Sequence, residues 1–405
     1  MRRVVITGCG VVTAAGTELE GFWNALMDGT CFIRPLQHFS YYDMPALLGA
    51  EVELAPEDGK GLGSDATTSR ARCAQLANAA VERALSDAAM MPVCDPDRTG
   101  VIFGSTLGEE REVGDLSERW VRNGPDDFGD EFWVRCDNHR LASRIAGEHG
   151  IGGPVQFCAA ACSSGNAAVA FAYDLVSSGA ADVMIAGGAD ALTRSIYCGF
   201  ERMGALSKSI CRPFDRRRDG VSFGEGAGVV VLETLEHANR RNAPRIYAEI
   251  AGYGMSNDAH HITAPDPNGE GFARAMKQAL HSTLAPFDEI DYISPHGTGT
   301  LYNDRSECRA IKSVFGDRAR HIPVSSVKSM IGHTNGAAGA IETVVCALAL
   351  THQAVPPTAN LNDPDPECDL DCVPLVGRAL PIQACLNLAA GFGGFNVCLV
   401  LKRVQ

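Results

Sequence analysis

Two cysteines, Cys158 and Cys162, are the first candidates for a chemical role in this 405-residue chain. They lie in FCAAACSSGNAAVAF (157–171), where the residues before Cys158 are typical of a strand and the alanine-rich run after Ser163 is typical of a helix. We expect Cys162 at the strand-to-helix turn, where helix N–H groups lower the pKa of a thiol and can stabilise an oxyanion. Cys158 is expected on the strand as an inert buried thiol. The alternative is that both cysteines only pack in the core among small residues.

Two further segments carry candidate side chains. His296 lies in ISPHGTGT, and Lys328 and His333 lie in VSSVKSMIGHTNGAAGA. Each segment follows an expected strand and opens into glycine and other small residues, as the segment of Cys162 does. Because binding sites in α/β sheets gather at strand ends, we expect these segments to meet. Another glycine-rich turn, AAGFGGFN, places Phe392 between two glycines, which favours a large side chain that moves or gates access.

Short apolar runs alternate with longer amphipathic patterns in the first part of the chain. The runs predict strands, and the longer patterns predict helices. Strands are expected at 4–12, 100–106, 154–160, 182–188 and 228–233, and helices over 18–29 and 72–88. This order predicts an α/β fold with a parallel or mixed sheet that helices cover on both faces.

The same order begins again after residue 244. Strands are expected at 245–254, 290–294, 322–328, 384–390 and 396–403, and helices over 271–284, 307–315 and 337–352. Two similar halves follow, 1–244 with the candidate nucleophile and 245–405 with the histidines, the lysine and the gate loop. The polar segment 107–139 is predicted to be an insertion that lies over the surface or against a partner.

Composition argues against several classes of protein. Hydrophobic residues make up 45% and charged residues 21%, which is typical of a globular chain. The net charge of −14 argues against nucleic acid as a partner, because phosphate binding needs a basic surface. The apolar runs are too short for a membrane span.

The cysteines point to a reducing compartment and not to a metal. There is no recognisable export signal, and the 15 cysteines have no repeating spacing, so we expect reduced thiols in a cytoplasmic protein. Cys368 and Cys372 form a clustered pair, but no second pair of ligands lies near them in sequence, and no metal site is predicted.

Seven motifs occur together along the whole chain: AACSSG, DVMIAGGAD, RPFDRRRDGVSFGEGAGVVVLE, GMSNDAHHITAPDPNG, PHGTGT, VKSMIGHTNGAAGA and GFGGFN. In this order and spacing the chain resembles the β-ketoacyl-acyl carrier protein synthases, both the type II condensing enzyme of fatty acid synthesis and the ketosynthase subunits of type II polyketide synthases. The resemblance implies a thiolase-like, five-layer αβαβα sandwich made of two similar halves. It also implies a dimer, either a homodimer or a heterodimer with a ketosynthase-like chain-length subunit.

The resemblance further implies a decarboxylative Claisen condensation of an acyl-Cys162 thioester with malonyl-acyl carrier protein. His296 and His333 would donate hydrogen bonds to the malonyl thioester oxygen as CO2 leaves. Lys328 would orient the histidines, with Glu342 as its buried partner. No cofactor is implied beyond the phosphopantetheine of the acyl carrier protein, which would be the partner that carries the substrates.

Other positions follow from the same resemblance. The backbone N–H groups of Cys162 and Phe392 would form the oxyanion hole, and Phe392 would also be the gate. Three hydroxyl side chains would line the pantetheine tunnel, namely Thr263, Thr298 and Thr300. Two acidic residues match positions that we interpret as structural, namely Asp304 and Glu307.

The chain departs from the type II condensing enzyme around the acyl pocket. Phe395 replaces a small hydroxyl residue and is expected to contact substrate, Ala390 replaces a phenylalanine, and Asn335 replaces an apolar residue. The basic residues for carrier docking are replaced by DDFGDE, so the candidates for that role are other basic residues, such as Arg70 and Arg72, or a partner subunit.

These departures favour chain elongation in secondary metabolism. Housekeeping fatty acid elongation is the alternative. A non-catalytic chain-length subunit, a degradative thiolase and a scaffold protein are further alternatives. The presence of the cysteine, both histidines and the lysine argues against a non-catalytic chain-length subunit.

Overall fold

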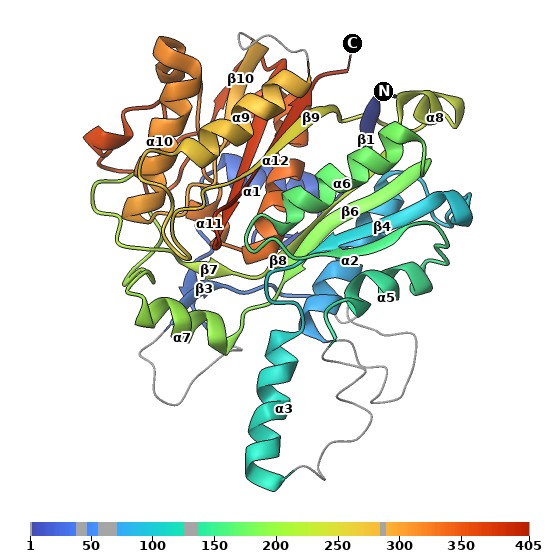
Figure 1. Ribbon diagram of the computed structural model, residues 1–405, viewed down its shortest axis with the longest axis horizontal. Coiled ribbons are helices and arrows are strands. Elements are labelled where there is room, and N and C mark those ends of the chain that lie inside the picture. Colours follow the sequence, from blue (N-terminus) through green and yellow to red (C-terminus); the bar gives the residue numbers. More distant parts are fainter. Residues whose placement is uncertain (1, 38–46, 56–70, 125–136, 284–288, 405) are drawn as a thin grey trace.

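A nine-stranded mixed sheet runs through the whole molecule (Figure 1). The computed structural model describes residues 2–37, 47–55, 71–124, 137–283 and 289–404. The strand order is β10-β13-β14-β9-β1-β8-β6-β4-β5. The bounds are β1 Val4–Thr13, β4 Thr99–Gly104, β5 Val155–Cys158, β6 Val183–Asp190, β8 Gly226–Thr234, β9 Ala248–Asn257, β10 Ile290–Ser294, β13 Ala384–Gly391 and β14 Phe395–Lys402.

The sheet has one part from each half of the chain. The strands of the first half stand together at one end, and those of the second half at the other. The two parts join where Val4–Ile6 of β1 pair antiparallel with Ala248–Ile250 of β9. A division at residue 244 falls between α8 (Leu235–Arg240) and β9, and that boundary stays a prediction.

Helices form three layers around the two parts of the sheet. Two buried helices, α6 (Ser164–Ser178) and α12 (Ala338–His352), contact strands of both parts and one another. On the outer faces, α2 (Arg72–Asp87) and α5 (Arg140–Glu148) contact first-half strands, whereas α9 (Glu270–Ser282) contacts second-half strands. Helix α10 (Leu301–Phe315) packs against α9. The predicted five-layer αβαβα sandwich is therefore confirmed.

The other strands are short, and the other helices are 4 to 14 residues long. The helices are α1 Leu19–Met27, α3 Glu110–Asn123, α7 Arg194–Arg202 and α11 Lys328–Ile331. The strands are β2 Arg34–Pro35, β3 Leu48–Ala50, β7 Phe223–Gly224, β11 Ala354–Val355 and β12 Arg378–Ala379. The helix expected over 18–29 and the one expected over 72–88 correspond to α1 and α2.

Two expectations for the second half were wrong in detail. The segment 322–328 is not a strand, because it contributes only one bridge, between Ile293 and Val324, and the N–H of Ser326 donates to the Thr358 hydroxyl. Helix α10 begins at Leu301, six residues before the expected start at 307. In the segment 322–328 a side-chain hydrogen bond helps to set the backbone path, and hydrophobic periodicity does not detect it.

The predicted insertion contains helix α3, which projects from the body of the molecule (Figure 1). Trp120 and Val121 are exposed on this helix, at 53% and 87%. The rest of the insertion, 125–136, lies outside the described residues. An exposed apolar pair on a projecting helix fits the predicted position at the surface or against a partner.

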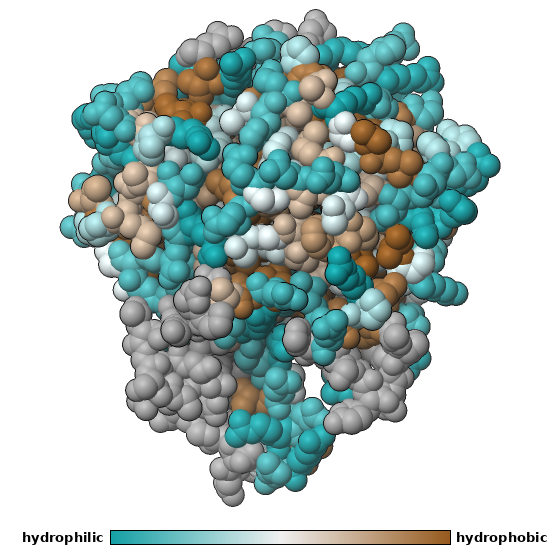
Figure 2. All heavy atoms as spheres, turned by 180° about the vertical axis from the view of Figure 1, so that it is seen from behind, coloured by the Kyte–Doolittle hydropathy of each residue, from teal (hydrophilic) through white to brown (hydrophobic). Residues whose placement is uncertain are grey.

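The surface is mainly hydrophilic. Figure 2 shows the face opposite to that of Figure 1, where hydrophobic residues form separate patches within a hydrophilic surface. Among the described residues, none of the helices is both long and apolar enough to cross a membrane.

Glycine allows α2 to lie unusually close to β1. A Cβ at Gly10 would overlap the carbonyl oxygen of Ala80 in α2, and one at Gly8 would overlap the carbonyl oxygen of Ala84. The facing side chains of α2 are small, so the helix backbone rests directly on the strand. This contact anchors the outer layer of the first half.

We expect Gly10→Ala to lower the free energy of unfolding by about 1–3 kcal/mol, because overpacking forces the backbone of α2 away from β1. Denaturant titration measures this change. Gly21→Ala is the matched control, since nothing lies within 4 Å of a Cβ at this position in α1. The control should raise stability by about 0.5–1 kcal/mol. Equal effects of the two substitutions would contradict the close approach.

Candidate active site

Cys162 lies on the turn that joins β5 to α6. The strand ends at Cys158 and the helix begins at Ser164, so Cys162 precedes the helix by two residues. Ala161 adopts a left-handed conformation with φ of 48°. This sharp turn directs Cys162 to the end of the sheet, with only 9% of its surface exposed.

The pKa of the Cys162 thiol differs from the prediction. Burial and, to a smaller extent, the carboxylate of Asp190 raise its pKa to about 12, against the lowering effects of Lys328, the local backbone N–H and Thr106. The predicted fall in pKa was wrong, because the turn removes the sulfur from water. Cys162 is a protonated thiol at neutral pH, so its nucleophilic form requires a base. Cys158 lies on the strand with a pKa that burial raises to about 11.

The two histidines come from different turns of the second half. The N–H of His296 donates to Glu307 Oε1 at 2.6 Å, just after β10. The N–H of His333 donates to the carbonyl oxygen of Ser222 at 2.7 Å. Their rings meet edge to face, with centroids 5.3 Å apart. Backbone hydrogen bonds therefore fix both turns and leave the imidazoles free to meet a ligand.

Both imidazoles are neutral. Burial, the Lys328 ammonium and His333 lower the pKa of His296 well below 6.5, and burial and Lys328 lower that of His333. The Nδ1 atom of each ring is buried without a hydrogen-bond partner in the described part of the chain. A neutral imidazole carries one N–H donor and one acceptor nitrogen, so each ring can donate to a substrate oxygen or accept a proton.

Lys328 and Glu342 form a buried ion pair. Lys328 starts α11, Glu342 lies in α12, and each is 1% exposed. The Lys328 ammonium donates to Glu342 Oε1. Burial raises the pKa of Glu342 to about 7, and the ammonium opposes this rise. The pair places a positive charge close enough to the imidazoles to keep them unprotonated.

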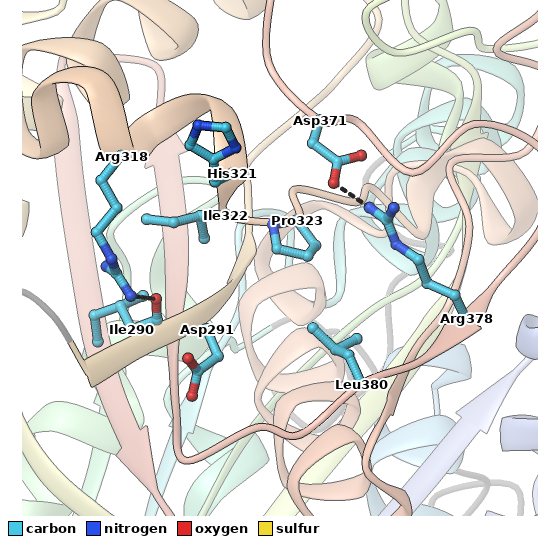
Figure 3. A pocket seen from close by; sticks show the side chains of 9 residues that line it. All are labelled: Ile290, Asp291, Arg318, His321, Ile322, Pro323, Asp371, Arg378 and Leu380. Atoms are coloured by element: carbon cyan, nitrogen blue, oxygen red, sulfur yellow. Dashed lines mark hydrogen bonds and ion pairs between the residues drawn. The ribbon is translucent and has the colours of Figure 1, made fainter.

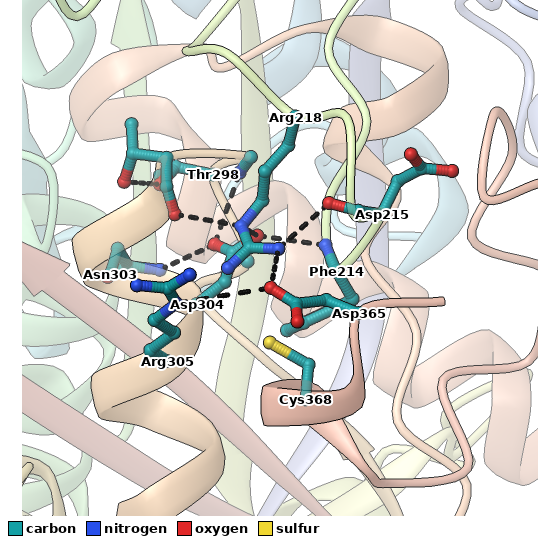
Figure 4. A network of polar contacts seen from close by, with 12 residues as sticks. Phe214, Asp215, Arg218, Thr298, Asn303, Asp304, Arg305, Asp365 and Cys368 are labelled. Atoms are coloured by element: carbon teal, nitrogen blue, oxygen red, sulfur yellow. Dashed lines mark hydrogen bonds and ion pairs between the residues drawn. The ribbon is translucent and has the colours of Figure 1, made fainter. Parts of the chain in front are cut away.

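A polar network supports the turn that carries His296, Thr298 and Thr300 (Figure 4). Asp304 accepts hydrogen bonds from the N–H of Gly299 at 3.2 Å and of Phe214 at 2.9 Å. The buried Arg218 donates to the carbonyl oxygen of Thr300 at 3.3 Å. Arg218 also lies 3.5 Å from Asp304, between their charged atoms. Sequence reasoning missed Arg218, although the arginine-rich motif RPFDRRRDG contains it.

A cavity of about 280 Å³ receives the thiol and both imidazoles, whereas Lys328 and Glu342 do not line it. The predicted residues that line it are Cys162, Thr263, His296, Thr298, Thr300, His333 and Phe392. Phe395 does not line it and is 44% exposed, so its predicted contact with substrate is not supported. The reason is strand alternation, because its neighbour Asn396 in β14 faces the cavity.

Phe392 lies at the mouth of the cavity, on the turn between β13 and β14. Its ring stacks on Phe200 of α7, with centroids 5.2 Å apart and planes 6° from parallel. A Cβ at the preceding Gly391 would lie 3.0 Å from the nitrogen of Cys162. Within the described residues, the N–H groups of Cys162 and Phe392 donate to no backbone carbonyl. Two neighbouring turns thus offer free donors, and Phe200 is a site residue that the sequence analysis missed.

Asp190 joins the turns behind Cys162. This buried carboxylate accepts hydrogen bonds from the hydroxyl of Ser105 and the N–H groups of Thr106, Leu107 and Gly336, at 2.6–2.9 Å. Burial raises its pKa to about 6, although these four donors oppose the rise. It ties the turn after β4 to the turn that follows His333. Asp190 is the last residue of the motif DVMIAGGAD, and the sequence analysis predicted no role for it.

Arg72 is unsuited to docking an acidic carrier protein. Its guanidinium is 2.5 Å from Glu225 Oε1 and also donates to the carbonyl oxygen of Val52. Only 20% of its side chain is exposed, which argues against the predicted docking role. Arg70, the other candidate, lies outside the described residues.

A second cavity, of about 320 Å³, lies beside β10 in the second half of the chain (Figure 3). Its arginines are occupied, since Arg378 pairs with Asp371 and Arg318 donates to the carbonyl oxygen of Ile290. It contains no thiol or hydroxyl nucleophile. In the part of the chain that the structure describes, no three His, Cys, Asp or Glu side chains are grouped to hold a metal ion.

Both halves of the chain match domains of one known protein family. Residues 1–238 match the family described as beta-ketoacyl synthase, N-terminal domain, and residues 247–362 match beta-ketoacyl synthase, C-terminal domain. The chain belongs to the β-ketoacyl synthase family. A relative of this β-ketoacyl synthase from Streptomyces halstedii, named putative polyketide beta-ketoacyl synthase 1, is 38% identical and aligns over 99% of this chain and 98% of its own.

Fatty acid and polyketide enzymes are equally similar to this β-ketoacyl synthase. A Synechocystis relative named 3-oxoacyl-acyl-carrier-protein synthase 2 is also 38% identical, over 100% of this chain and 99% of its own. The ishigamide ketosynthase/chain length factor has a TM-score of 0.94 and 37% identity, with full coverage of both chains. Overall identity therefore does not separate the two pathways.

Glu109 is a buried acid behind the site. It lies at the start of α3, is 1% exposed, and has a pKa that burial and Glu112 raise to about 8. An unfolded glutamate ionises near pH 4.5. Between these two pH values the folded protein holds one more proton than the unfolded chain, so stability falls as pH rises.

We expect Glu109→Gln to flatten this dependence between about pH 5.5 and 7.5, by about 1.4 kcal/mol per pH unit. Denaturant titrations of the variant and the wild type at several pH values measure the difference. Glu118→Gln on the exposed surface of α3 is the matched control and should keep the wild-type slope. Parallel slopes for wild type and Glu109→Gln would contradict the assignment.

Proposed function

We propose that this protein is a condensing enzyme that joins an acyl-Cys162 thioester to malonyl-acyl carrier protein with loss of CO2. The observation that carries the proposal is the meeting of one buried thiol with two neutral imidazoles in a single cavity. A thiol accepts and releases acyl groups readily, and neutral imidazoles can donate hydrogen bonds to a developing oxyanion.

Acylation is the first step of this proposal. Cys162 Sγ attacks the carbonyl carbon of the acyl-pantetheine thioester, and its proton ends on the departing pantetheine thiol. The raised pKa of Cys162 means that a neighbouring imidazole must first accept the proton. The N–H groups of Cys162 and Phe392 stabilise the oxyanion, which fits their free donors on adjacent turns.

Decarboxylation and condensation complete the cycle. The bond between the malonyl carboxylate and its methylene breaks, CO2 leaves, and the electron pair passes to the thioester oxygen. His296 and His333 donate to that oxygen, and the carbanion then attacks the acyl-Cys162 carbonyl and releases the thiolate. Thr263, Thr298 and Thr300 line the cavity and would hold the pantetheine arm. No cofactor beyond that arm is required.

The pathway is proposed to be type II polyketide elongation. A solved ketosynthase described with its type II polyketide acyl-carrier protein and a bound hexaketide is 34% identical, with a TM-score of 0.89 and full coverage. Asn335, which replaces an apolar residue of the type II condensing enzyme, also favours this pathway over fatty acid elongation. A non-catalytic chain-length role is disfavoured because the thiol, both imidazoles and the Lys328–Glu342 pair are assembled.

The partners proposed are an acyl carrier protein and a second ketosynthase-like chain, either a copy of this one or a chain-length subunit. Strand β5 supports the second partner, since it ends the sheet and exposes Val155 at 41%. A cytoplasmic location is proposed on the chemistry of the thiols. Apart from Cys198, the 13 other cysteines among the described residues form no disulfide, which fits a reducing compartment.

Cys162→Ala tests the proposal directly. After incubation with octanoyl-pantetheine, intact-protein mass spectrometry should show an acyl adduct on wild type and none on Cys162→Ala. Cys158→Ala is the matched control and should keep the adduct, because Cys158 does not line the cavity. A wild type without an adduct, or an adduct that survives Cys162→Ala, would overturn the proposed function.

Lys328→Ala is expected to slow CO2 release from malonyl-pantetheine by at least about 100-fold, because the imidazoles lose their orienting charge. Acylation of Cys162 should fall less than about tenfold, so the ratio of the two rates separates positioning from unfolding. Lys312→Ala, which removes a surface ion pair with Asp369, is the matched control.

Lys328→Ala leaves the Glu342 carboxylate buried without its partner, and the protein can then fail to fold. The double variant Lys328→Met, Glu342→Leu avoids this, because it removes both charges of the ion pair. It should show the same unequal loss of the two steps. Equal loss of acylation and CO2 release in a folded variant would argue against the positioning role.

A further inference from the structure

Exposed apolar side chains gather around the mouth of the active-site cavity. Among the described residues, 12 large hydrophobic side chains are exposed, and five of them line this one cavity. These five, which we call the apolar rim, have exposed fractions from 37% to 75% and are Met203, Ile262, Leu301, Tyr302 and Phe392. Single exposed apolar residues are common on protein surfaces, but a group of five around one opening marks an interaction surface.

The apolar rim is built on ordered parts of the fold. Leu301 and Tyr302 are the first two residues of α10, and Met203 directly follows the last residue of α7. The carbonyl oxygen of Ile262 accepts the N–H of Gly393 at 2.8 Å, which ties its loop to the turn between β13 and β14. The backbone under the rim is therefore already in place, so a partner can bind with little ordering of the chain.

The charges at the mouth do not suit an acidic partner. The described residues that line the cavity include two carboxylates, Asp219 and Asp258, and no lysine or arginine. One turn into α10 from the rim, Arg305 is already paired with Glu367, with 2.5 Å between their charged atoms. The surface next to the opening therefore offers apolar contact and negative charge.

A partner that delivers an acyl group to Cys162 must cover this rim. Cys162 is 9% exposed and lines the same cavity, so a tethered substrate arm has to enter through the mouth. The protein that carries the arm then rests on the side chains outside the opening. Ile262 and Tyr302 are the most exposed of these, at 75% each.

We propose that this protein recognises its acyl carrier protein by apolar contact, with Ile262 and Tyr302 as the main contacts, and not by ion pairs. This inference rests on the proposed function and adds the chemistry of the partner, which presents apolar side chains beside its pantetheine arm. Aromatic side chains and methionine are enriched in the cores of protein interfaces, whereas lysine, glutamate and aspartate are depleted there. The alternative is docking on Arg202 and Lys208, which are exposed near the rim in sequence but do not line the cavity.

The test uses each acyl carrier protein of the host, loaded with octanoyl-phosphopantetheine, and free octanoyl-pantetheine as the reference. Mass spectrometry follows the acyl adduct on Cys162 of the full-length protein. The rate constant with the fastest carrier is divided by that with octanoyl-pantetheine, and we expect a ratio of at least about tenfold for wild type. An increase in NaCl from about 0.05 M to about 0.5 M should change this ratio less than about threefold, because salt screens ion pairs and not apolar contact.

Tyr302→Ser and Ile262→Ser should each lower the ratio by about fivefold or more, because truncation of a central apolar contact costs the most binding. Val376→Ser is the matched control and should keep the ratio, since Val376 is 74% exposed and does not line the cavity. Arg202→Ala and Lys208→Ala should each change the ratio less than about twofold.

A fall of more than about tenfold at high salt, or a larger loss in Arg202→Ala or Lys208→Ala than in Tyr302→Ser, would overturn the inference in favour of ion pairs. An unchanged ratio in folded Tyr302→Ser and Ile262→Ser would overturn it as well, and so would a wild type that reacts no faster with any carrier than with octanoyl-pantetheine. Absence of any adduct, with octanoyl-pantetheine and with every carrier, would instead overturn the proposed function.

Discussion

The site depends on direct contact of backbone with backbone between the two halves of the chain. Cys162 belongs to the first half and both imidazoles to the second, so no single half holds a complete site. Glycines permit the contact, because a Cβ at Gly165 would lie 2.7 Å from the nitrogen of Ala340 and one at Gly391 would lie 3.0 Å from that of Cys162. The position of the thiol relative to the imidazoles is therefore determined by main-chain packing, which is stiffer than side-chain contact.

Burial then determines the protonation of the site. The same exclusion of water raises the pKa of the Cys162 thiol and lowers the pKa of His296 and His333. The resting site thus holds neutral groups around one compensated ion pair, Lys328 with Glu342. Each unpaired buried polar atom costs about 1–3 kcal/mol, so a substrate oxygen that pairs with an imidazole nitrogen of His296 or His333 would recover part of this cost.

Sequence patterns predicted most elements of this fold and the segments that meet at the site. The strands and helices of the first half followed hydrophobic periodicity, and the motifs around Cys162, His296 and His333 were found from residue types and small neighbours. Periodicity could not find the Asp190 hydrogen bonds or the stacking of Phe200 on Phe392, since these pairs are distant in sequence. It also could not show that β14 turns Phe395 away from the cavity. The thiol pKa was mispredicted because burial is a property of the packed chain.

In the proposed function, Phe392 has two roles, as the gate and as an oxyanion donor. Its ring stacks on Phe200 at the mouth of the cavity, and its N–H lies on the turn next to Cys162. Under that proposal, a substitution that shifts the main chain of this turn moves both the ring and the N–H donor, whereas rotation about the side-chain torsions of Phe392 moves the ring alone. An evolutionary change of chain preference at this turn therefore carries a change in turnover with it. A broader range of acyl chains is reached more simply by substitution of Phe200, because its N–H is not one of the proposed oxyanion donors.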